Sequence, residues 1–444
     1  MIALITTITL IFEYTILDFL FSENKNFIKN VTFGFSSFLF MFLIISEILF
    51  AFNYYSLFKT YLICGGIALI IIISLFFLRY RGDIKHLTQK NKQVVPFELY
   101  IILIFGFLLS VNRFELFGMG QDQGVYQIKA ILMTEGDNDN YFTVKENELI
   151  KNESDKEKLH EFIKLGKAGL GFYPLESNNN RGTIAIEENN PYTGIFHGLP
   201  NFPALLSLSG KIFGIQGIMY IPALFYLLSI VTIFLICHFN LELKRSTSGI
   251  ITSLFMLSPI VVWVSKSALT EIVLTSIILT FIYFITSKEE SYKKLLWFPI
   301  TVFSFTHVSI YTLMPMFVVV FVILMIRERE KRYITAGIIS IISYLVGLIV
   351  MGFTSPQYTF DNYRPLLNLI HAYPDAAHTF PIALIGAVSA LVILASLYIF
   401  SRKSDFIMMK PINILNVFKM LIVIGILVIT VSYTHLTLPT IYSV

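Results

Sequence analysis

The chain has 444 residues, of which 55% are hydrophobic and 14% are charged, and its mean hydropathy is +0.72. Because a soluble domain carries about 25% charged residues, this composition excludes a water-soluble globule, a coiled coil and a disordered chain. The apolar residues form continuous runs rather than alternating, which excludes an outer-membrane β-barrel. The net charge of +4 does not suggest a nucleic-acid partner. We therefore predict an all-α polytopic membrane protein.

Apolar runs along the chain are long enough to cross a membrane, which takes about 20 helical residues. They cover roughly residues 1–21, 31–53, 60–78, 96–111, 215–239, 248–264, 268–286, 333–353, 379–400 and 412–430. The run Leu295–Ile326 is too long for one span, and its polar middle, FTHVSIY, predicts a hairpin of two short helices. The total is about 11 to 12 transmembrane helices. Cys64 and Cys237 lie near opposite membrane faces in this topology, so we expect no disulfide.

Basic residues orient these spans through the positive-inside rule. Lys and Arg follow the third, fifth and seventh spans, the hairpin, and the span 379–400. All these loops fall on one side, which we assign to the cytoplasm. The N-terminus and the long loop 112–200 then lie outside the plasma (inner) membrane. In this large extracytoplasmic loop we expect short surface helices, one over GVYQIKAILM and one over residues 153–168.

Asp122 is the first candidate for chemistry. It follows a span that leaves the membrane and is flanked by Gly118, Gly120 and Gly124, which allow sharp turns and a close ligand. A carboxylate at the membrane–water boundary suits a general base that acts on a hydroxyl. The alternative is a solvated residue that caps the following surface helix. Tyr126 lies on one face of that helix.

Three further segments place polar residues at the outer face. His197 precedes a half-helix that ends at Gly214, in TGIFHGLPNFPALLSLSGKIFG, although an isolated histidine is more often structural. Lys266 and Glu271 flank an outer turn, where the lysine could meet a lipid phosphate. The alternative for this pair is a snorkelling lysine and an acid that complements a helix dipole. His307 lies at the bend of the hairpin and could line a cavity.

Other polar residues have no assigned partner in the sequence. Glu13, Asp18 and Glu47 are acids within apolar runs, and such residues are functional candidates by default. Arg364 lies in an outer loop with His371, Asp375 and His378. Two histidines and an aspartate could suggest a metal, but their spacing matches no established metal motif.

Read in order, these segments resemble the GT-C superfamily of integral-membrane glycosyltransferases, of the glycosyltransferase family 39 and aminoarabinose-transferase type. In that family an essential Asp precedes a surface helix, as Asp122 precedes GVYQIKAILMTEG. A His-Pro-Pro-Leu-like segment leads into a half-helix, which HGLPNFPALLSLSGKIFG resembles. SKSALTE resembles the family's basic residue and acid at an outer turn, and FTHVSIYTLMP resembles its short hairpin. The resemblance covers about residues 96–330.

The resemblance implies a polyprenyl-phosphate sugar donor and an acceptor lipid, glycan or protein. Asp122 would accept the acceptor hydroxyl proton during a one-step inverting displacement. Lys266 and His307 would stabilise the leaving phosphate, and the substrate-binding candidates would also include His197, Tyr126, Glu271 and Arg364. Gln123 stands where the family often has glutamate, which weakens the case for a divalent metal, so we assign no cofactor and no metal ligand.

Two other functions remain open. A polysaccharide polymerase or ligase that uses a lipid diphosphate would more often rely on paired arginines, whereas the outer side offers Arg113, Arg181 and Arg364. A non-enzymatic transporter would need polar residues distributed through the spans.

We divide the chain into three N-terminal helices (1–95), a GT-C-like core (96–330), further helices (331–430) and a tail (431–444). Back-translation of Val431–Thr440 matches a transposon-end adapter used in DNA sequencing. We therefore expect the tail to be non-native and the true C-terminus to be missing; the alternative is a natural extracytoplasmic tail.

Overall fold

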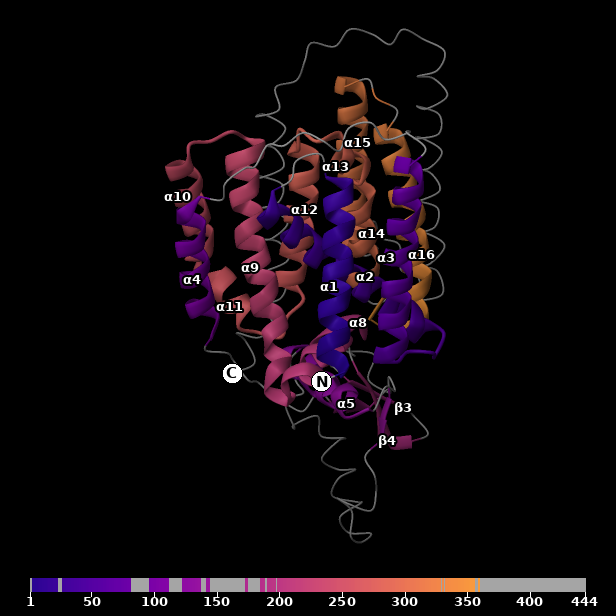
Figure 1. Cartoon of the computed structure of the whole chain (residues 1–444). Helices are drawn as coiled ribbons and strands as arrows, with labels where there is room; N and C mark the ends of the chain where they lie inside the picture. The colour runs from indigo at the N-terminus through magenta and orange to yellow at the C-terminus, as the bar shows by residue number, and fades with distance from the viewer. Residues whose placement is uncertain are drawn as a thin grey trace, which may run out of the picture.

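The computed structural model describes residues 2–22, 26–80, 96–111, 122–136, 141–143, 172–174, 184–187, 190–196, 198–328, 330, 332–355 and 358–359. These residues form a bundle of apolar helices with a small sheet at one end (Figure 1). The N-terminus, α5 and strands β3 and β4 lie at this end, which we call the sheet end. Helix α13 lies at the opposite end, which we call the α13 end. The predicted helix at 153–168 and the spans at 379–400 and 412–430 lie outside the described residues.

The helices of the bundle follow the predicted apolar runs. Their bounds are α1 Ile2–Phe21, α2 Phe27–Ala51, α3 Leu57–Tyr80, α4 Phe97–Val111, α9 Tyr220–Leu235, α10 Arg245–Met256, α11 Pro259–Ser265, α12 Glu271–Thr286, α13 Glu290–Lys294, α14 Trp297–Thr306, α15 Ile310–Glu328 and α16 Arg332–Thr354. The 3-10 turn η1, Ile215–Met219, precedes α9, and the π-helical turn η2, Ile236–Asn240, follows it.

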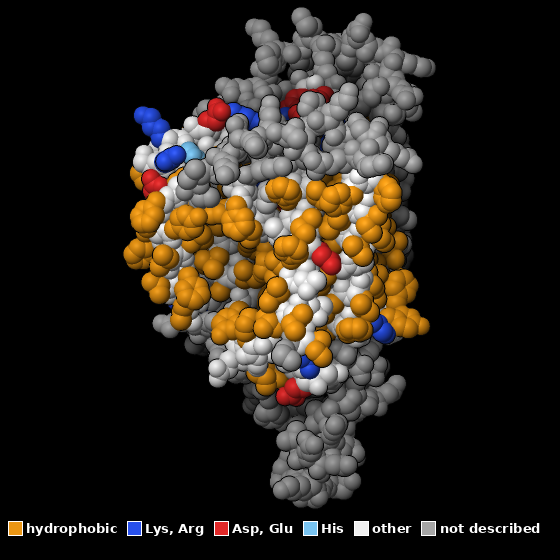
Figure 2. Space-filling model, viewed as in Figure 1, with side chains coloured by type: hydrophobic (Ala, Val, Ile, Leu, Met, Phe, Trp, Pro, Cys, Tyr) orange, Lys and Arg blue, Asp and Glu red, His pale blue; other side chains and the backbone are white. Residues whose placement is uncertain are grey.

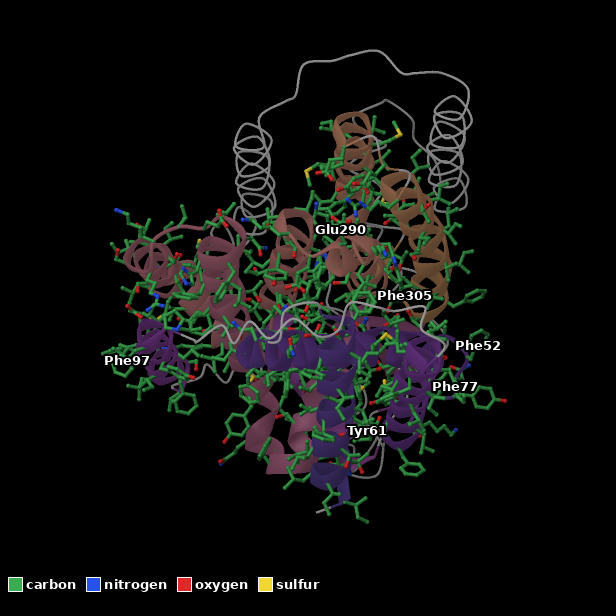
Figure 3. The ribbon with its side chains drawn as sticks, turned by 45° about the horizontal axis from the view of Figure 1, so that its top comes forward. Phe52, Tyr61, Phe77, Phe97, Glu290 and Phe305 are labelled. Carbon is green, nitrogen blue, oxygen red and sulfur yellow. The ribbon has the colours of Figure 1, made fainter. Side chains whose placement is uncertain are left out.

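Five of these segments are long and apolar enough to cross a membrane, or six if the bent pair α10–α11 is one span. Hydrophobic side chains form a broad band between the two ends (Figure 2). The exposed rings of Phe52, Phe77 and Phe97 lie at the outer edge of the bundle (Figure 3). This arrangement is consistent with an α-helical membrane protein, because lipid solvates apolar side chains and intrahelical bonds satisfy the backbone.

Two helix breaks interrupt the bundle. The predicted hairpin is confirmed, because α14 ends at Thr306 and α15 begins at Ile310. The run 248–264, predicted as one span, is instead bent by 62° between α10 and α11. Pro259 causes this bend, since proline disfavours a helical conformation at the residue before it, and Ser258 has ψ 120°.

The sheet end contains elements that a purely helical prediction misses. Helix α5, Asp122–Glu135, is followed by the short strands β1 Tyr141–Thr143, β2 Phe172–Pro174, β3 Ile184–Glu187 and β4 Asn190–Phe196. The strand order is β1-β4-β3-β2. Strand β4 pairs antiparallel with β1 and β3, and β2 pairs parallel with β3. The loop 112–200 therefore combines a helix with a sheet, and α8, Asn201–Phe213, leads from it into the bundle.

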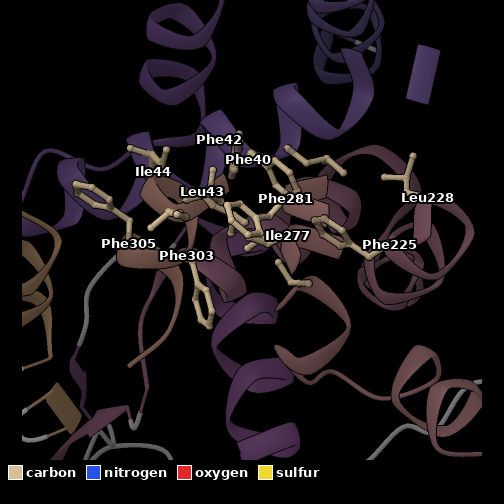
Figure 4. Packing of buried hydrophobic residues seen from close by; sticks show 14 of the residues in the cluster. Phe40, Phe42, Leu43, Ile44, Phe225, Leu228, Ile277, Phe281, Phe303 and Phe305 are labelled. Carbon is tan, nitrogen blue, oxygen red and sulfur yellow. The ribbon is translucent and has the colours of Figure 1, made fainter. Parts of the chain in front are cut away.

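Helix α2 lies in the centre of the bundle rather than beside it. Its residues Phe40, Phe42, Leu43 and Ile44 are buried and pack among side chains of α9, α12 and α14 (Figure 4). The rings of Phe40 and Phe225 stack with centroids 6.3 Å apart. The first three helices are thus part of one continuous core with the rest of the described bundle.

A buried polar cluster joins the N-terminal helices to the α13 end. Lys29 Nζ lies 2.5 Å from Glu289 Oε1 and donates to Ser22 Oγ at 2.5 Å. Tyr292 Oη donates to Asp18 Oδ1 at 2.9 Å, and the amide of Asn30, with its nitrogen facing Asp18, lies 3.2 Å from Oδ2. The Lys29 and Glu289 side chains are only 4% and 7% exposed. Breaking such a pair leaves an uncompensated buried charge.

We predict that Lys29→Met lowers the free energy of unfolding by about 3–5 kcal/mol, because it leaves the Glu289 carboxylate buried and unpaired. The matched control is Lys288→Met. Its Lys288–Glu242 pair is 60% and 71% exposed, so this loss should be below about 1 kcal/mol. Denaturation of the purified protein in detergent measures both. Equal losses in the two variants would contradict a stabilising role for the buried pair.

Both cysteines are free and buried. Cys64 lies on α3 and Cys237 in η2. The prediction that they do not form a disulfide is confirmed.

Candidate functional site

Three of the predicted segments meet at the sheet end. Helix α5 begins at Asp122. Its next turn carries Tyr126, whose hydroxyl lies against the backbone of Gly198. Three residues further on, Asn201 Nδ2 donates to the backbone carbonyl of Phe305 at 2.6 Å, close to the turn that holds His307. The start of α5, the segment 198–201 and the end of α14 are therefore contiguous.

Gly198 has a backbone conformation that few other residues could adopt. It has φ +84°, a conformation that proline, fixed near −65°, cannot adopt. A Cβ atom at this position would lie 2.6 Å from the Tyr126 hydroxyl, so even alanine would collide. A glycine after His197 thus lets the chain pass close beneath the ring of Tyr126.

Helix α5 packs tightly against α8. Tyr126 meets Phe202 edge-on, with ring centroids 5.6 Å apart. A Cβ atom on Gly210 of α8 would lie 2.5 Å from Thr134 Oγ1 of α5, which shows how closely the two backbones approach. The expected surface helix is therefore confirmed as a helix, but it is buried on more than one face, with Val125, Lys129 and Ala130 all at most 2% exposed.

Glu47 lies near the end of α2 and contacts the ends of two other helices. Its side chain is fully buried, and Thr354 Oγ1, at the end of α16, donates to its Oε1. The backbone N–H of Asn201 faces the same carboxylate. Since Pro200 supplies no side-chain cap to α8, the Glu47 carboxylate complements the N-terminus of that helix.

Lys129 is buried, and its side chain lies close to the end of α2. It is 2% exposed, and its Nζ lies 5.7 Å from the centroid of the Phe50 ring, three residues after Glu47. Phe50 in turn stacks on Tyr55 with centroids 4.0 Å apart. The lysine side chain therefore lies against the last turns of α2. It was absent from the sequence candidates because a lysine in an amphipathic helix is usually solvated.

Asn201 connects the start of α8 to the end of α14. Its Nδ2 satisfies the Phe305 carbonyl in the last turn of α14, one of the carbonyls that a helix leaves without an intrahelical partner. Its Oδ1 and the Oε2 of Glu47 are buried and have no hydrogen-bond partner.

His307 has extended backbone angles and ends α14. The N–H of Ser309 donates to its Nδ1 at 3.1 Å, so the ring proton resides on Nε2. His307 lies in the turn outside both helices, and desolvation lowers the pKa of its imidazole to about 4. The ring is therefore neutral at pH 7 and can offer a hydrogen bond through its Nε2–H.

The remaining candidates stand apart from this group. Lys266 is half-buried in the turn before α12, and Glu271 begins that helix. Helices α11 and α12 pack mainly against α4, α9 and α14 rather than α5 or α8. His197 and Arg364, together with His371, Asp375 and His378, lie outside the described residues. Asp18 belongs to the cluster at the α13 end.

Within the described part of the chain, no group of three or more His, Cys, Asp or Glu side chains could hold a metal ion. The described polar groups of the site are thus a carboxylate, an ammonium, amides, hydroxyls and one neutral imidazole.

We predict that Gly198→Ala destabilises the sheet end. The new methyl group collides with Tyr126, and the alanine backbone has a strained, positive φ. The control is Gly136→Ala, which also has a positive φ, +112°, but nothing within 4 Å of the added Cβ. Proteolysis of the purified protein at increasing temperature should show a larger loss for Gly198→Ala. Equal losses would attribute the whole effect to backbone strain.

The neutral state of His307 predicts a pH dependence of stability. The folded-state pKa of about 4 lies below the unfolded value of about 6.5, so folding disfavours the protonated ring. The contribution to stability is complete above about pH 6.5 and is lost as the pH falls towards 4. Thermal unfolding between pH 7 and 4 should therefore show a steeper decline for the wild type than for His307→Gln. Equal declines in the unfolding temperature of the two proteins would contradict a neutral His307 ring in the folded state.

No protein-family model, curated protein or solved structure matches the chain. Roles for the residues around α5 therefore come from their contacts and from the sequence resemblance.

Proposed function

We propose that the protein transfers a sugar from a polyprenyl-phosphate donor to an acceptor hydroxyl at the extracytoplasmic face, with Asp122 as the general base. The observation that supports this most is the meeting of the α5 start, the segment 198–201 and the His307 turn at one end of an apolar bundle. A lipid-linked donor needs this combination, because its chain stays in the bilayer while its phosphate and sugar need polar groups at the interface.

The distribution of charge supports the proposed orientation. Described basic residues in or beside loops at the α13 end include Lys244, Arg245, Lys288, Lys293, Lys294 and Arg332. By the positive-inside rule this end faces the cytoplasm. The sheet end, where α5 lies, then faces outward in the plasma (inner) membrane.

In the proposed reaction, the acceptor hydroxyl gives its proton to Asp122 as its oxygen attacks the anomeric carbon. The bond between that carbon and the phosphate oxygen breaks, and the polyprenyl phosphate leaves with the electron pair. His307 contributes its Nε2–H as a neutral donor, and the sequence resemblance assigns Lys266, in the separate turn before α12, as the source of positive charge for the leaving phosphate. The acceptor is a lipid, a glycan or a protein, and no cofactor is required by this scheme.

We predict that Asp122→Asn lowers the rate of sugar transfer by about 10²–10⁴-fold, because an amide cannot accept the hydroxyl proton. The matched control is Glu135→Gln, at the exposed end of the same helix, which should retain the wild-type rate. Membranes with matched amounts of protein are incubated with a panel of labelled polyprenyl-phosphate sugars.

Transfer that persists in Asp122→Asn would place the base elsewhere. Equal losses in both variants would indicate damage to α5 rather than loss of a base. If wild-type membranes use none of the donors, a lipid-diphosphate polymerase or a transporter becomes the better hypothesis.

A further inference from the structure

Glu13 is an acid within α1, an apolar helix of the bundle. Its Oε2 is buried and has no hydrogen-bond partner among the described residues. A Cβ atom added to Gly65 of α3 would lie 3.5 Å from this oxygen, so the carboxyl group lies against the α3 backbone. Ionisable side chains inside a membrane almost always pair with another polar group, because lipid solvates them poorly. The position of Glu13 therefore calls for a partner of opposite charge.

The two helices that meet at this carboxyl group leave most of their surface uncovered. In α1 and α3 alike, 22% of the residues in the apolar stretch are buried, against 67% in α2. Thr9 and Ile16 lie about one turn before and after Glu13 on the same side of α1, and Thr9 is exposed. We call these three residues the Glu13 face. Lipid could cover its apolar part, but only a polar partner can satisfy the acid.

The chain itself carries a cation that matches this acid. Lys419 lies within the apolar run 412–430, a predicted membrane span outside the described residues. A lysine inside a span also needs a partner of opposite charge. Glu13 and Lys419 are thus complementary.

The two charges are also expected at the same depth in the membrane. Helix α1 ends at Phe21, next to the cluster at the α13 end, which we assign to the cytoplasm. Glu13 is about 12 Å from that end at 1.5 Å per residue. Arg402 and Lys403 place the start of the run 412–430 on the cytoplasmic side as well. Lys419 is then about 11 Å from that side.

We propose that the segment 412–430 packs on the Glu13 face and that the Lys419 ammonium pairs with the Glu13 carboxylate. The segment runs antiparallel to α1, so Thr9 lies opposite Val423 and Ile16 lies opposite Asn416. The C-terminal part of the chain then covers its N-terminal helices. This packing does not depend on the proposed function.

Disulfide cross-linking of the full chain in isolated membranes tests the register. Both native cysteines are replaced by alanine, and cysteine pairs are introduced at Thr9 with Val423 and at Ile16 with Asn416. The matched controls are the crossed pairs, Thr9 with Asn416 and Ile16 with Val423. A crossed pair is displaced by seven residues, about 10 Å, which is more than a disulfide spans. We expect the in-register pairs to cross-link at least about fivefold more than the crossed pairs.

Exchange of the two charges tests the ion pair. Glu13→Lys and Lys419→Glu each bring like charges together, so each should lower cross-linking of the Ile16–Asn416 cysteine pair by at least about threefold. The double variant, with both substitutions, should restore cross-linking to within about twofold of the starting value. Lys410→Glu, in the loop before the segment, is the control and should leave cross-linking unchanged.

Equal cross-linking of in-register and crossed pairs, or none in any pair, would overturn the packing. This comparison keeps both native charges, so it stays decisive if the charge variants fail to fold. Loss of cross-linking in the single variants without recovery in the double variant would overturn the ion pair. A product with the electrophoretic mobility of a dimer would also overturn the proposal, because it would assign the Glu13 face to a second copy of the chain.

Discussion

The sheet end depends on one constraint. The backbone N–H and C=O groups at helix ends that are buried away from water need hydrogen-bond partners from neighbouring elements. Asn201 caps the last turn of α14 with its amide, and Ser355 donates to the Gly198 carbonyl at 2.6 Å. Glu47 faces the N-terminus of α8 while it accepts from Thr354. In lipid or in a dry core each of these groups would cost several kcal/mol if left alone. The same residues that satisfy the backbone therefore determine where α5 can lie.

The features that the sequence predicted are those with a local cause. Continuous apolar runs marked the helices, the polar residues around His307 marked the break between α14 and α15, and Gly214 marked the end of α8. The helix expected over GVYQIKAILM is present, although α5 begins two residues earlier, at Asp122. In contrast, the bend at Pro259 was missed although proline is a local signal, because the apolar run continued through it.

The features that the sequence could not predict depend on distant partners. Glu47 contacts Asn201 and Thr354, which follow it along the chain only after long intervals, and no periodicity relates them. The strands β3 and β4 are short, and the alternation in Ile184–Glu187 is too brief to distinguish from a loop without the pairing strand. Helix α2 was grouped with α1 and α3 as a separate unit, because nothing in an apolar helix specifies which neighbours it contacts. Whether an apolar helix lies at the exposed rim or in the buried centre is decided only when the helices pack together.

The two buried charged clusters differ in a way that bears on their roles. At the α13 end both oxygens of Glu289 are engaged, by Lys29 and Ser22, and both oxygens of Asp18 face donors. Buried polar atoms without a partner occur at both ends, as Asn26 Nδ2 beside the α13-end cluster and as Glu47 Oε2 and Asn201 Oδ1 at the sheet end. The two clusters differ in their charges. At the α13 end the Lys29 ammonium pairs with Glu289, whereas the Glu47 carboxylate accepts its hydrogen bond from the neutral Thr354 hydroxyl. Because removal of either partner of a buried ion pair leaves an unpaired charge, the α13 end is best understood as the structural joint of the bundle.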